Sequence, residues 1–240
     1  SHWIGGLFFL IFLILIFANF KNDYKLSNLV HNPDRATNLL KDIKKITTQV
    51  FFLYVLLTIL IFILFSFSGI RLFNSFNLAM SISSSGGFLP MNELSDIIRF
   101  KFQKIILAIG LTFSALNIYF FYSCFNDTNF LKKHYEDTSI LLVAFFFSLV
   151  LFFSIGDMNF LNIFLNVISS LSNSGLSILT PPENFYLIFL FLTIVGGSII
   201  SNSSGIKFLR LYILFKSSVI EIFKLVSPNT VMDQRILKTE

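Results

Sequence analysis

Charged residues are scarce in this chain of 240 residues: they make up 13% of it, whereas 55% is hydrophobic and 17% is aromatic. A water-soluble domain could not cover that much apolar surface, so the composition indicates an integral membrane protein. Cys124 is the single cysteine, which excludes a disulfide within the chain and is typical of a small hydrophobic residue. Histidine is rare too, and His2, His31 and His134 are too scattered for a metal cluster.

Long apolar runs account for this composition. They cover 3–20, 49–69, 105–125, 138–156, 185–199 and 206–226. A spanning helix needs about 20 mostly apolar residues, so four runs predict membrane helices, and the last two indicate one long helix that is interrupted. No methionine precedes the first run, and it lacks the basic start and cleavage site of a signal peptide. We expect an all-α integral membrane protein whose sequence begins here within a larger polypeptide.

The basic residues predict the orientation. Segments 20–48, 126–137 and 207–240 carry fourteen of the eighteen Lys and Arg residues. The positive-inside rule places these segments in the cytoplasm and the segments between them on the outer side. The net charge of +5 reflects this bias, so we expect a lipid bilayer and not nucleic acid as the partner.

Two copies of one unusual segment, 72–86 and 161–175, lie 89 positions apart on the outer side. Each is an apolar stretch too short to cross a bilayer, followed by a Ser/Asn-rich tract that ends in glycine. The coinciding pairs are Leu72/Leu161, Asn77/Asn166, Ser81/Ser170, Ser83/Ser172, Ser85/Ser174 and Gly86/Gly175. A polar loop at membrane depth is tolerated only where it is buried in protein or lines a water-filled path. The pattern predicts, twice, a short re-entrant helix and a returning loop between two longer helices.

The two tracts offer uncharged dipolar groups, and not charged side chains, to a bound ion. No charged residue occurs in 72–92 or 158–182, so an ion there would be bound by backbone carbonyls and serine hydroxyls. Such groups can replace the water shell of a bare monovalent cation, and glycine permits the backbone angles that direct carbonyls to one axis. The alternative is that serine and glycine only allow close helix packing. Two tracts in register on the same side favour the pore.

A third polar segment, 196–207, interrupts the apolar stretch from 185 to 226 and contains four serines and three glycines. A broken helix at membrane depth is typical of a permeation path, where it would act as a gate inside the filter. The alternative is a Gly/Ser kink filled by neighbouring helices. The gate residues predicted are Gly196, Gly197, Ser198, Ser201, Asn202, Ser203, Ser204 and Gly205.

Enzymatic chemistry is not expected. No histidine occurs inside an apolar run, which argues against an intramembrane serine protease. The string Ser-Ile-Gly-Asp at 154–157 has half of an aspartyl protease motif and no partner aspartate. Asp157 is better explained as a cap of the short helix that begins near Asn159.

Six strings occur in an order that can be compared with known families. They are His2-Trp3-Ile4-Gly5-Gly6, Ser83-Ser84-Ser85-Gly86-Gly87-Phe88, Gly110-Leu111-Thr112-Phe113, Ser172-Asn173-Ser174-Gly175-Leu176, Gly196-Gly197 through Gly205-Ile206-Lys207 with Arg210, and Ser227-Pro228-Asn229-Thr230. Together they resemble the Trk/Ktr/HKT potassium-transporter superfamily, closest to the TrkH-type pore subunits. There the corresponding strings are a QWLGG-like helix start, the STGGF filter, a GxNF string, the TTTGF filter, the GGCAGSTAGGIK gate loop with a following Arg, and an HPNAV-like turn.

This resemblance implies four pseudo-repeats around one pore, each made of a helix, a pore helix with its filter, and a second helix. The implied parts are the second helix of repeat 1 at 1–20, a cytoplasmic connector at 21–48, repeat 2 at 49–125 with its pore helix and filter at 72–90, a cytoplasmic loop at 126–137, repeat 3 at 138–226 with its pore helix and filter at 159–176 and its gate loop at 196–207, and a cytoplasmic tail at 227–240. The implied filters are Ser83, Ser84, Ser85, Gly86 and Gly87 in repeat 2, and Ser172, Asn173, Ser174 and Gly175 in repeat 3.

The resemblance also implies K⁺ as the transported ion, bound only at the filter, with no cofactor. It implies a multi-pass protein of the plasma (inner) membrane with its filter side extracellular or periplasmic. A homodimer and a cytosolic nucleotide-binding regulatory subunit of the TrkA/KtrA type are further expectations. The chain departs from the family by serine at 85 and 174, by Asn173 and Leu176, and by Ile199 and Ile200, and some members with a filter serine admit Na⁺.

Two hypotheses therefore remain open. In the first, the chain is a cation-conducting subunit whose filter is lined by Ser85, Gly86, Gly87, Ser174 and Gly175. Lys207 and Arg210 would then lie at the inner mouth, either repelling cations or anchoring the helix to lipid headgroups. In the second, the chain is a non-conducting membrane scaffold or a truncated fragment of such a transporter.

Overall fold

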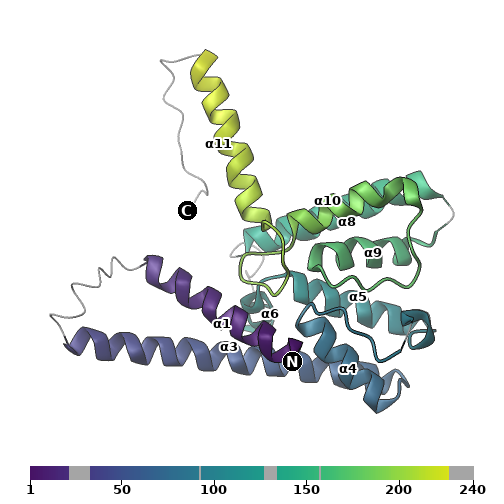
Figure 1. Ribbon diagram of the computed structural model, residues 1–240, viewed down its shortest axis with the longest axis horizontal. Coiled ribbons are helices and arrows are strands. Elements are labelled where there is room, and N and C mark those ends of the chain that lie inside the picture. The colour runs from purple at the N-terminus through teal and green to yellow at the C-terminus, as the bar shows by residue number, and fades with distance from the viewer. Residues whose placement is uncertain (22–32, 92, 127–133, 157, 227–240) are drawn as a thin grey trace.

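The computed structural model describes residues 1–21, 33–91, 93–126, 134–156 and 158–226, and within these ranges it contains helices and loops but no strand (Figure 1). The α-helices are α1 (His2–Lys21), α3 (Pro33–Phe67), α4 (Leu72–Ser83), α5 (Lys101–Ala115), α6 (Ile118–Asn126), α8 (Tyr135–Ile155), α9 (Phe160–Ser172), α10 (Tyr186–Val195) and α11 (Phe208–Val226), and the 3-10 helices are η1 (Leu94–Asp96) and η2 (Glu183–Phe185). The expected turn at 227–230 and the expected cap Asp157 lie outside the described residues, as do parts of the connections at 21–48 and 126–137.

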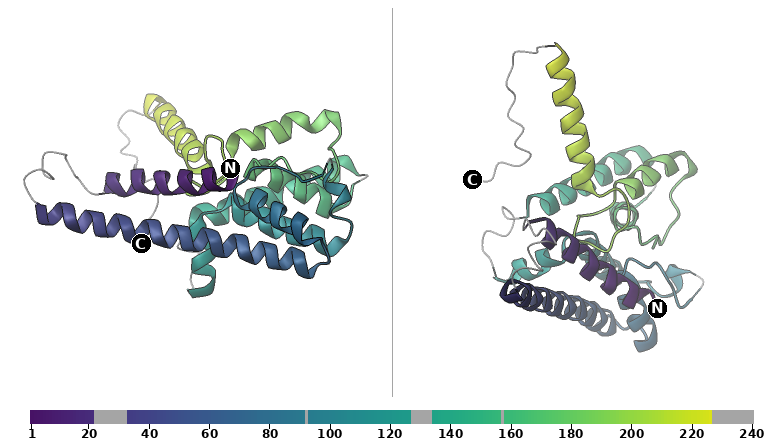
Figure 2. Two further views of the ribbon diagram at one scale, coloured as in Figure 1. Left: turned by 60° about the horizontal axis from the view of Figure 1, so that its bottom comes forward. Right: turned by 60° about the vertical axis from the view of Figure 1, so that its left-hand side comes forward.

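The helices form two similar units, in each of which a short helix packs between two others. In the first unit, α4 packs against α3 and α5; in the second, α9 packs against α8 and α10. The units meet where α5 packs on α9, which places the two short helices on either side of α5 (Figure 1). Helix α11 extends away from both units (Figure 2).

Helix α1 lies along α3 and runs antiparallel to it (Figure 1). The indole Nε1 of Trp3 donates to Thr58 Oγ1 at 3.0 Å, and the hydroxyl of Tyr54 donates to the carbonyl oxygen of Trp3 at 3.1 Å. These bonds attach the start of α1 to the second half of α3, which is the half that leads into the first short helix.

Glycine ends the two long helices. Gly69 has φ 84° two residues after α3 ends, and Gly156 has φ 68° directly after α8. Glycine adopts this left-handed conformation without the steric penalty that other residues incur, so each helix can stop and turn toward a short helix. At its start, α3 has Pro33 in the first helical position, where a missing N–H costs nothing. As a result α3 extends well into the segment where the sequence predicted only a connector.

One apolar core joins the units, and its fully buried side chains include Phe65, Leu78, Leu107, Leu151 and Leu192. The outward faces are also apolar: Phe67 is 87% exposed and Phe153 is 81% exposed. The segment Lys44–Phe67 of α3 and the whole of α8 have the length and hydropathy of membrane spans. A surface this apolar is typical of contact with lipid or with further membrane helices.

The structure corrects one expectation about the helices. The apolar run 105–125 was predicted to form one helix, but α5 ends at Ala115 and α6 begins at Ile118. The break contains neither glycine nor proline, but Asn117 Oδ1 accepts from the N–H of Tyr119 and so caps the start of α6, and tertiary contacts satisfy the other freed groups.

Candidate functional site

The loop after α4 turns by a left-handed cap. Ser85 has φ 51° and Gly87 has φ 67°. The backbone N–H of Ser85 donates to the carbonyl oxygen of Ile82 at 3.1 Å, and that of Gly86 donates to Ser81 at 2.8 Å. This pair of bonds is the Schellman pattern, which satisfies the last carbonyls of a helix while the chain reverses.

The loop after α9 has the same conformation. Asn173 has φ 56° and Gly175 has φ 66°. The N–H of Asn173 donates to Ser170 at 3.1 Å, and that of Ser174 donates to Ser169 at 3.1 Å. Asparagine tolerates the left-handed region better than most residues, which explains why it can occupy the place that Ser85 has in the first loop.

The two copies are therefore related by an offset of 88, and the offset of 89 predicted from residue identities is wrong for the loops. At 88 the positive-φ residues coincide, Ser85 with Asn173 and Gly87 with Gly175. Gly86, which the sequence paired with Gly175, corresponds to Ser174. The backbone conformation shows how the two copies align, whereas matching serines in a serine-rich tract do not define the alignment.

The two loops are in direct backbone contact. A Cβ atom on Gly87 would overlap the carbonyl oxygen of Ser174, so a side chain there would separate the loops. By contrast, a Cβ on Gly175 would meet nothing within 4 Å. The structure thus brings together residues from 83–87 and 172–175, which are far apart in the sequence. Of the two positive-φ glycines, Gly87 is at the contact and Gly175 faces open space.

Most serine hydroxyls of the loops are used to hold them in shape. Ser84 Oγ donates to the carbonyl oxygen of Met80 at 2.7 Å, and Ser172 Oγ donates to Ser174 Oγ at 3.0 Å. Ser85 Oγ lies 2.6 Å from Ser114 Oγ on α5. These hydroxyls therefore stabilise the loop conformation through hydrogen bonds within the protein.

Unlike the serine hydroxyls, the backbone carbonyl oxygens of 84–87 and 173–176 in the loops have no hydrogen-bond donor in the described part of the chain. Residues 84–87 and 173 are half-buried and Gly175 is exposed, so at membrane depth their carbonyls need a partner from water or an ion. Among the described residues, buried side-chain atoms that make no hydrogen bond include Ser81 Oγ, Asn166 Oδ1 and Asn173 Nδ2 in the two short helices and their loops, and Asn202 Oδ1 in the segment 196–207. The site is thus rich in polar groups that the described protein atoms leave unpaired.

The segment 196–207 lies between α10 and α11 as a folded loop. It begins with Gly196 at φ 69° and ends with Gly205 at φ 92° and Lys207 at φ 78°. The N–H of Ile206 donates to Ile194 at 2.9 Å, and the N–H of Phe208 donates to Gly197 at 3.2 Å. These bonds close the base of the loop, so α10 and α11 leave it at nearly the same point.

This loop fills the break between α5 and α6. The N–H of Ser198 donates to the carbonyl oxygen of Ala115 at 2.9 Å, and the N–H of Ile118 donates to Ile200 at 3.1 Å. A Cβ on Gly197 would overlap the carbonyl oxygen of Ala115, so glycine is needed for this approach. The backbone groups that the broken helix frees are satisfied by the loop, by Asp137 and by the side chain of Asn117, which together explain the break without glycine or proline at 116–117.

Lys207 is buried inside the loop and is 5% exposed. Its Nζ donates to the carbonyl oxygen of Ser203, and it lies 3.2 Å from the carbonyl oxygen of Ser201. Arg210, which the sequence grouped with Lys207, is exposed on α11. Only the lysine is therefore in a position to hold the loop.

Two acidic residues at the site, Glu136 and Asp137, were not predicted from the sequence, whereas Asn202 was predicted as a gate residue but without its partner. Asn202 Nδ2 donates to the carbonyl oxygen of Ser83 at 2.7 Å and so joins the loop to the first filter segment. From the start of α8, Glu136 Oε1 accepts from the N–H of Ile199 at 2.9 Å, and Asp137 Oδ1 accepts from the N–H of Asn117 at 2.9 Å. Their only sequence signal was two acidic residues next to an apolar run in a chain poor in charge.

No known family profile matches the chain, but the known proteins similar to it include the following two. The crystal structure of the potassium transporter TrkH from Vibrio parahaemolyticus superposes with a TM-score of 0.79 at 19% identity, over 96% of this chain and 50% of that one. An uncharacterized cation transporter of Methanocaldococcus jannaschii is 24% identical over 244 residues, which are 96% of this chain and 48% of the relative. The chain thus spans about half the length of both. The all-α membrane fold of the TrkH type, predicted from the six strings, is confirmed.

Proposed function

We propose that the chain is part of the pore of a monovalent-cation transporter and that its two serine-glycine loops form part of the selectivity filter. The observation that carries the proposal is the pair of touching loops whose carbonyl oxygens have no donor among the described residues. Carbonyl dipoles in this arrangement can replace the hydration shell of a cation. The names of the two similar proteins, both cation transporters, point to the same activity.

We propose K⁺ as the ion, as in the potassium transporter TrkH that the chain resembles, with Na⁺ as the second candidate. No charged residue occurs in the described parts of 72–92 and 158–182, so the attraction comes from dipoles, which suit a monovalent ion better than a divalent one. Two loops cannot enclose an ion. We therefore propose that further filter loops come from other sequence of the same polypeptide or from a second copy.

We propose that the segment 196–207 is the gate. It contacts the first filter segment through Asn202, and its shape is held by the buried ammonium group of Lys207. A loop that depends on one lysine and on backbone bonds to a neighbouring helix can be displaced as a unit. The basic segments would face the cytoplasm and the filter the outside of the plasma membrane. Homodimerisation and control by a cytosolic nucleotide-binding subunit belong to this proposal, and no enzymatic role does.

The test uses two glycines with matched backbones. Gly175 (φ 66°) and Gly156 (φ 68°) both have open space around them, but only Gly175 belongs to a filter loop. We expect Gly175→Asp to abolish rubidium uptake in cells or vesicles that contain the full polypeptide, and Gly156→Asp to retain it. Equal uptake by the two variants would contradict the proposal and favour a non-conducting scaffold. Expression and oligomeric state, compared for both variants, show whether assembly is unchanged.

A further inference from the structure

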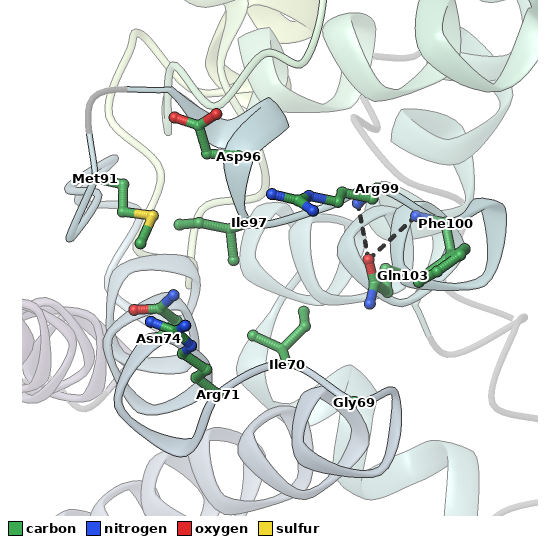
Figure 3. A pocket seen from close by; sticks show the side chains of 10 residues that line it. All are labelled: Gly69, Ile70, Arg71, Asn74, Met91, Asp96, Ile97, Arg99, Phe100 and Gln103. Atoms are coloured by element: carbon green, nitrogen blue, oxygen red, sulfur yellow. Dashed lines mark hydrogen bonds between the residues drawn. The ribbon is translucent and has the colours of Figure 1, made fainter.

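A cavity of about 510 Å³ lies away from the filter loops, at the N-terminal end of α4. Its wall includes Arg71 and Asn74 on one side and Asp96 and Arg99 on the other, as Figure 3 shows. Its volume is within the roughly 300–1,000 Å³ of ordinary ligand sites. Arg71 and Arg99 are among the four basic residues that the charge bias left on the outer side.

The charges of this cavity are not paired with each other. No ion pair joins Asp96 to Arg71 or Arg99 in the described part of the chain. The hydrogen bonds in the cavity wall go instead to Gln103, whose Oε1 accepts from the N–H of Arg99 at 2.8 Å and from that of Phe100 at 3.2 Å (Figure 3). Two guanidinium groups and one carboxylate are therefore available to a ligand.

A buried polar side chain in the wall also has no partner. Asn74 is 8% exposed, and no hydrogen bond to its amide is present among the described residues. Its counterpart in the other copy, at the offset of 88, is Asn162, whose Oδ1 accepts from Lys104 Nζ at 3.0 Å. The two asparagines occupy equivalent places in their helices, and the one that lines the cavity is the one without a partner.

The edge of the cavity is apolar. Phe100 lines it and is 69% exposed, and Leu72, next to Arg71 in the chain, is 68% exposed. A cavity with solvent-accessible arginines in its wall and exposed apolar side chains at its edge suits an amphiphile whose anionic group enters and whose chains stay outside. The start of α4 adds the positive end of a helix dipole, which favours an anion.

We propose that this cavity binds the headgroup of a phospholipid that carries both a phosphate and a primary ammonium group, as phosphatidylethanolamine does. Arg71 and Arg99 bind the phosphate, Asn74 donates to one of its oxygens, and Asp96 accepts from the ammonium group. Choline headgroups have no N–H to donate, and glycerol headgroups have no cation for Asp96. Such a lipid would brace the N-terminal end of α4, whose other end leads into the first filter loop. The proposal does not depend on ion conduction.

The experiment is native mass spectrometry of the full polypeptide in detergent with equimolar phosphatidylethanolamine, phosphatidylglycerol and phosphatidylcholine. We expect phosphatidylethanolamine to be retained in preference. The double variant Arg71→Gln/Arg99→Gln should weaken retention by about tenfold or more, because charged hydrogen bonds to the phosphate are lost. Asp96→Asn should reduce the preference over phosphatidylglycerol roughly two- to fivefold. Lys101→Gln, an exposed cation outside the cavity wall, is the matched control and should change nothing.

Three outcomes would overturn the proposal. Unchanged retention by the double variant would show that the lipid binds elsewhere. An equal loss with Lys101→Gln would indicate general attraction to the surface. Displacement of the lipid by millimolar inorganic phosphate would assign the cavity to the free anion. Both arginines are exposed, so their replacement leaves the core intact, and thermal unfolding of each variant checks this.

Discussion

The contact between the two serine-glycine loops, 83–87 and 172–175, can be tested by adding one methyl group. In Gly87→Ala the new Cβ would overlap the carbonyl oxygen of Ser174, and the residue would also have to keep φ 67°. The left-handed conformation costs about 1–2 kcal/mol for a non-glycine residue, and relief of the overlap by a shift of the loops costs about 1–3 kcal/mol. We therefore expect Gly87→Ala to lower the free energy of unfolding by about 2–5 kcal/mol.

Gly156→Ala is the matched control for this prediction. Gly156 has nearly the same φ, 68°, but its Cβ would meet nothing within 4 Å, so only the conformational term of about 1–2 kcal/mol applies. The measurement is unfolding of the purified protein in detergent, with hydrogen exchange at 173–176 as a local readout. If Gly87→Ala were no more destabilising than Gly156→Ala and left exchange at 173–176 unchanged, the loops would not touch as described.

Two further predictions concern the gate loop and the attachment of α1. Lys207→Met removes the ammonium group that binds the oxygens of Ser201 and Ser203, so we expect rubidium efflux from vesicles to rise about tenfold. Arg210→Met, on the exposed face of α11, is the control and should leave efflux unchanged. Equal effects of the two variants would show that the lysine does not hold the loop. Trp3→Phe keeps the packing of the aromatic ring but loses the bond to Thr58, which should lower stability by about 0.5–1.5 kcal/mol; a double-mutant cycle with Thr58→Val that gave no coupling would contradict this.

The sequence predicted α1, α8 and the second half of α3 because each coincides with a long apolar run. It also predicted where the helix after the second filter is interrupted, since glycine and serine are concentrated at 196–207, and α10 indeed ends at Val195. The break at 116–117 was not predicted. Asn117, which caps α6, was its one local signal, and the other contacts come from Asp137 and from a loop some 80 positions further along the chain.

The register of the two copies was predicted wrongly for a related reason. In tracts made of serine and glycine, identities arise at more than one offset, and only the backbone shows that Ser85 corresponds to Asn173. The outer cavity was missed because Arg71, Asp96 and Arg99 come from separate turns of the chain. The available signal was the presence of arginines on the side that the charge bias leaves poor in basic residues.

The hydrogen bonds at the break between α5 and α6 have a consequence for how the gate would move. Ala115 and Ile118 use the loop at 198–200 as a substitute for the helical partners that a continuous helix would provide. A partial withdrawal of the loop would leave both groups unpaired, whereas a complete withdrawal lets α5 and α6 join and recover the bonds within one helix. Intermediate positions are thus less stable than either end state. Opening would occur in abrupt steps, and a recording from one molecule would show two current levels and no gradual rise between them.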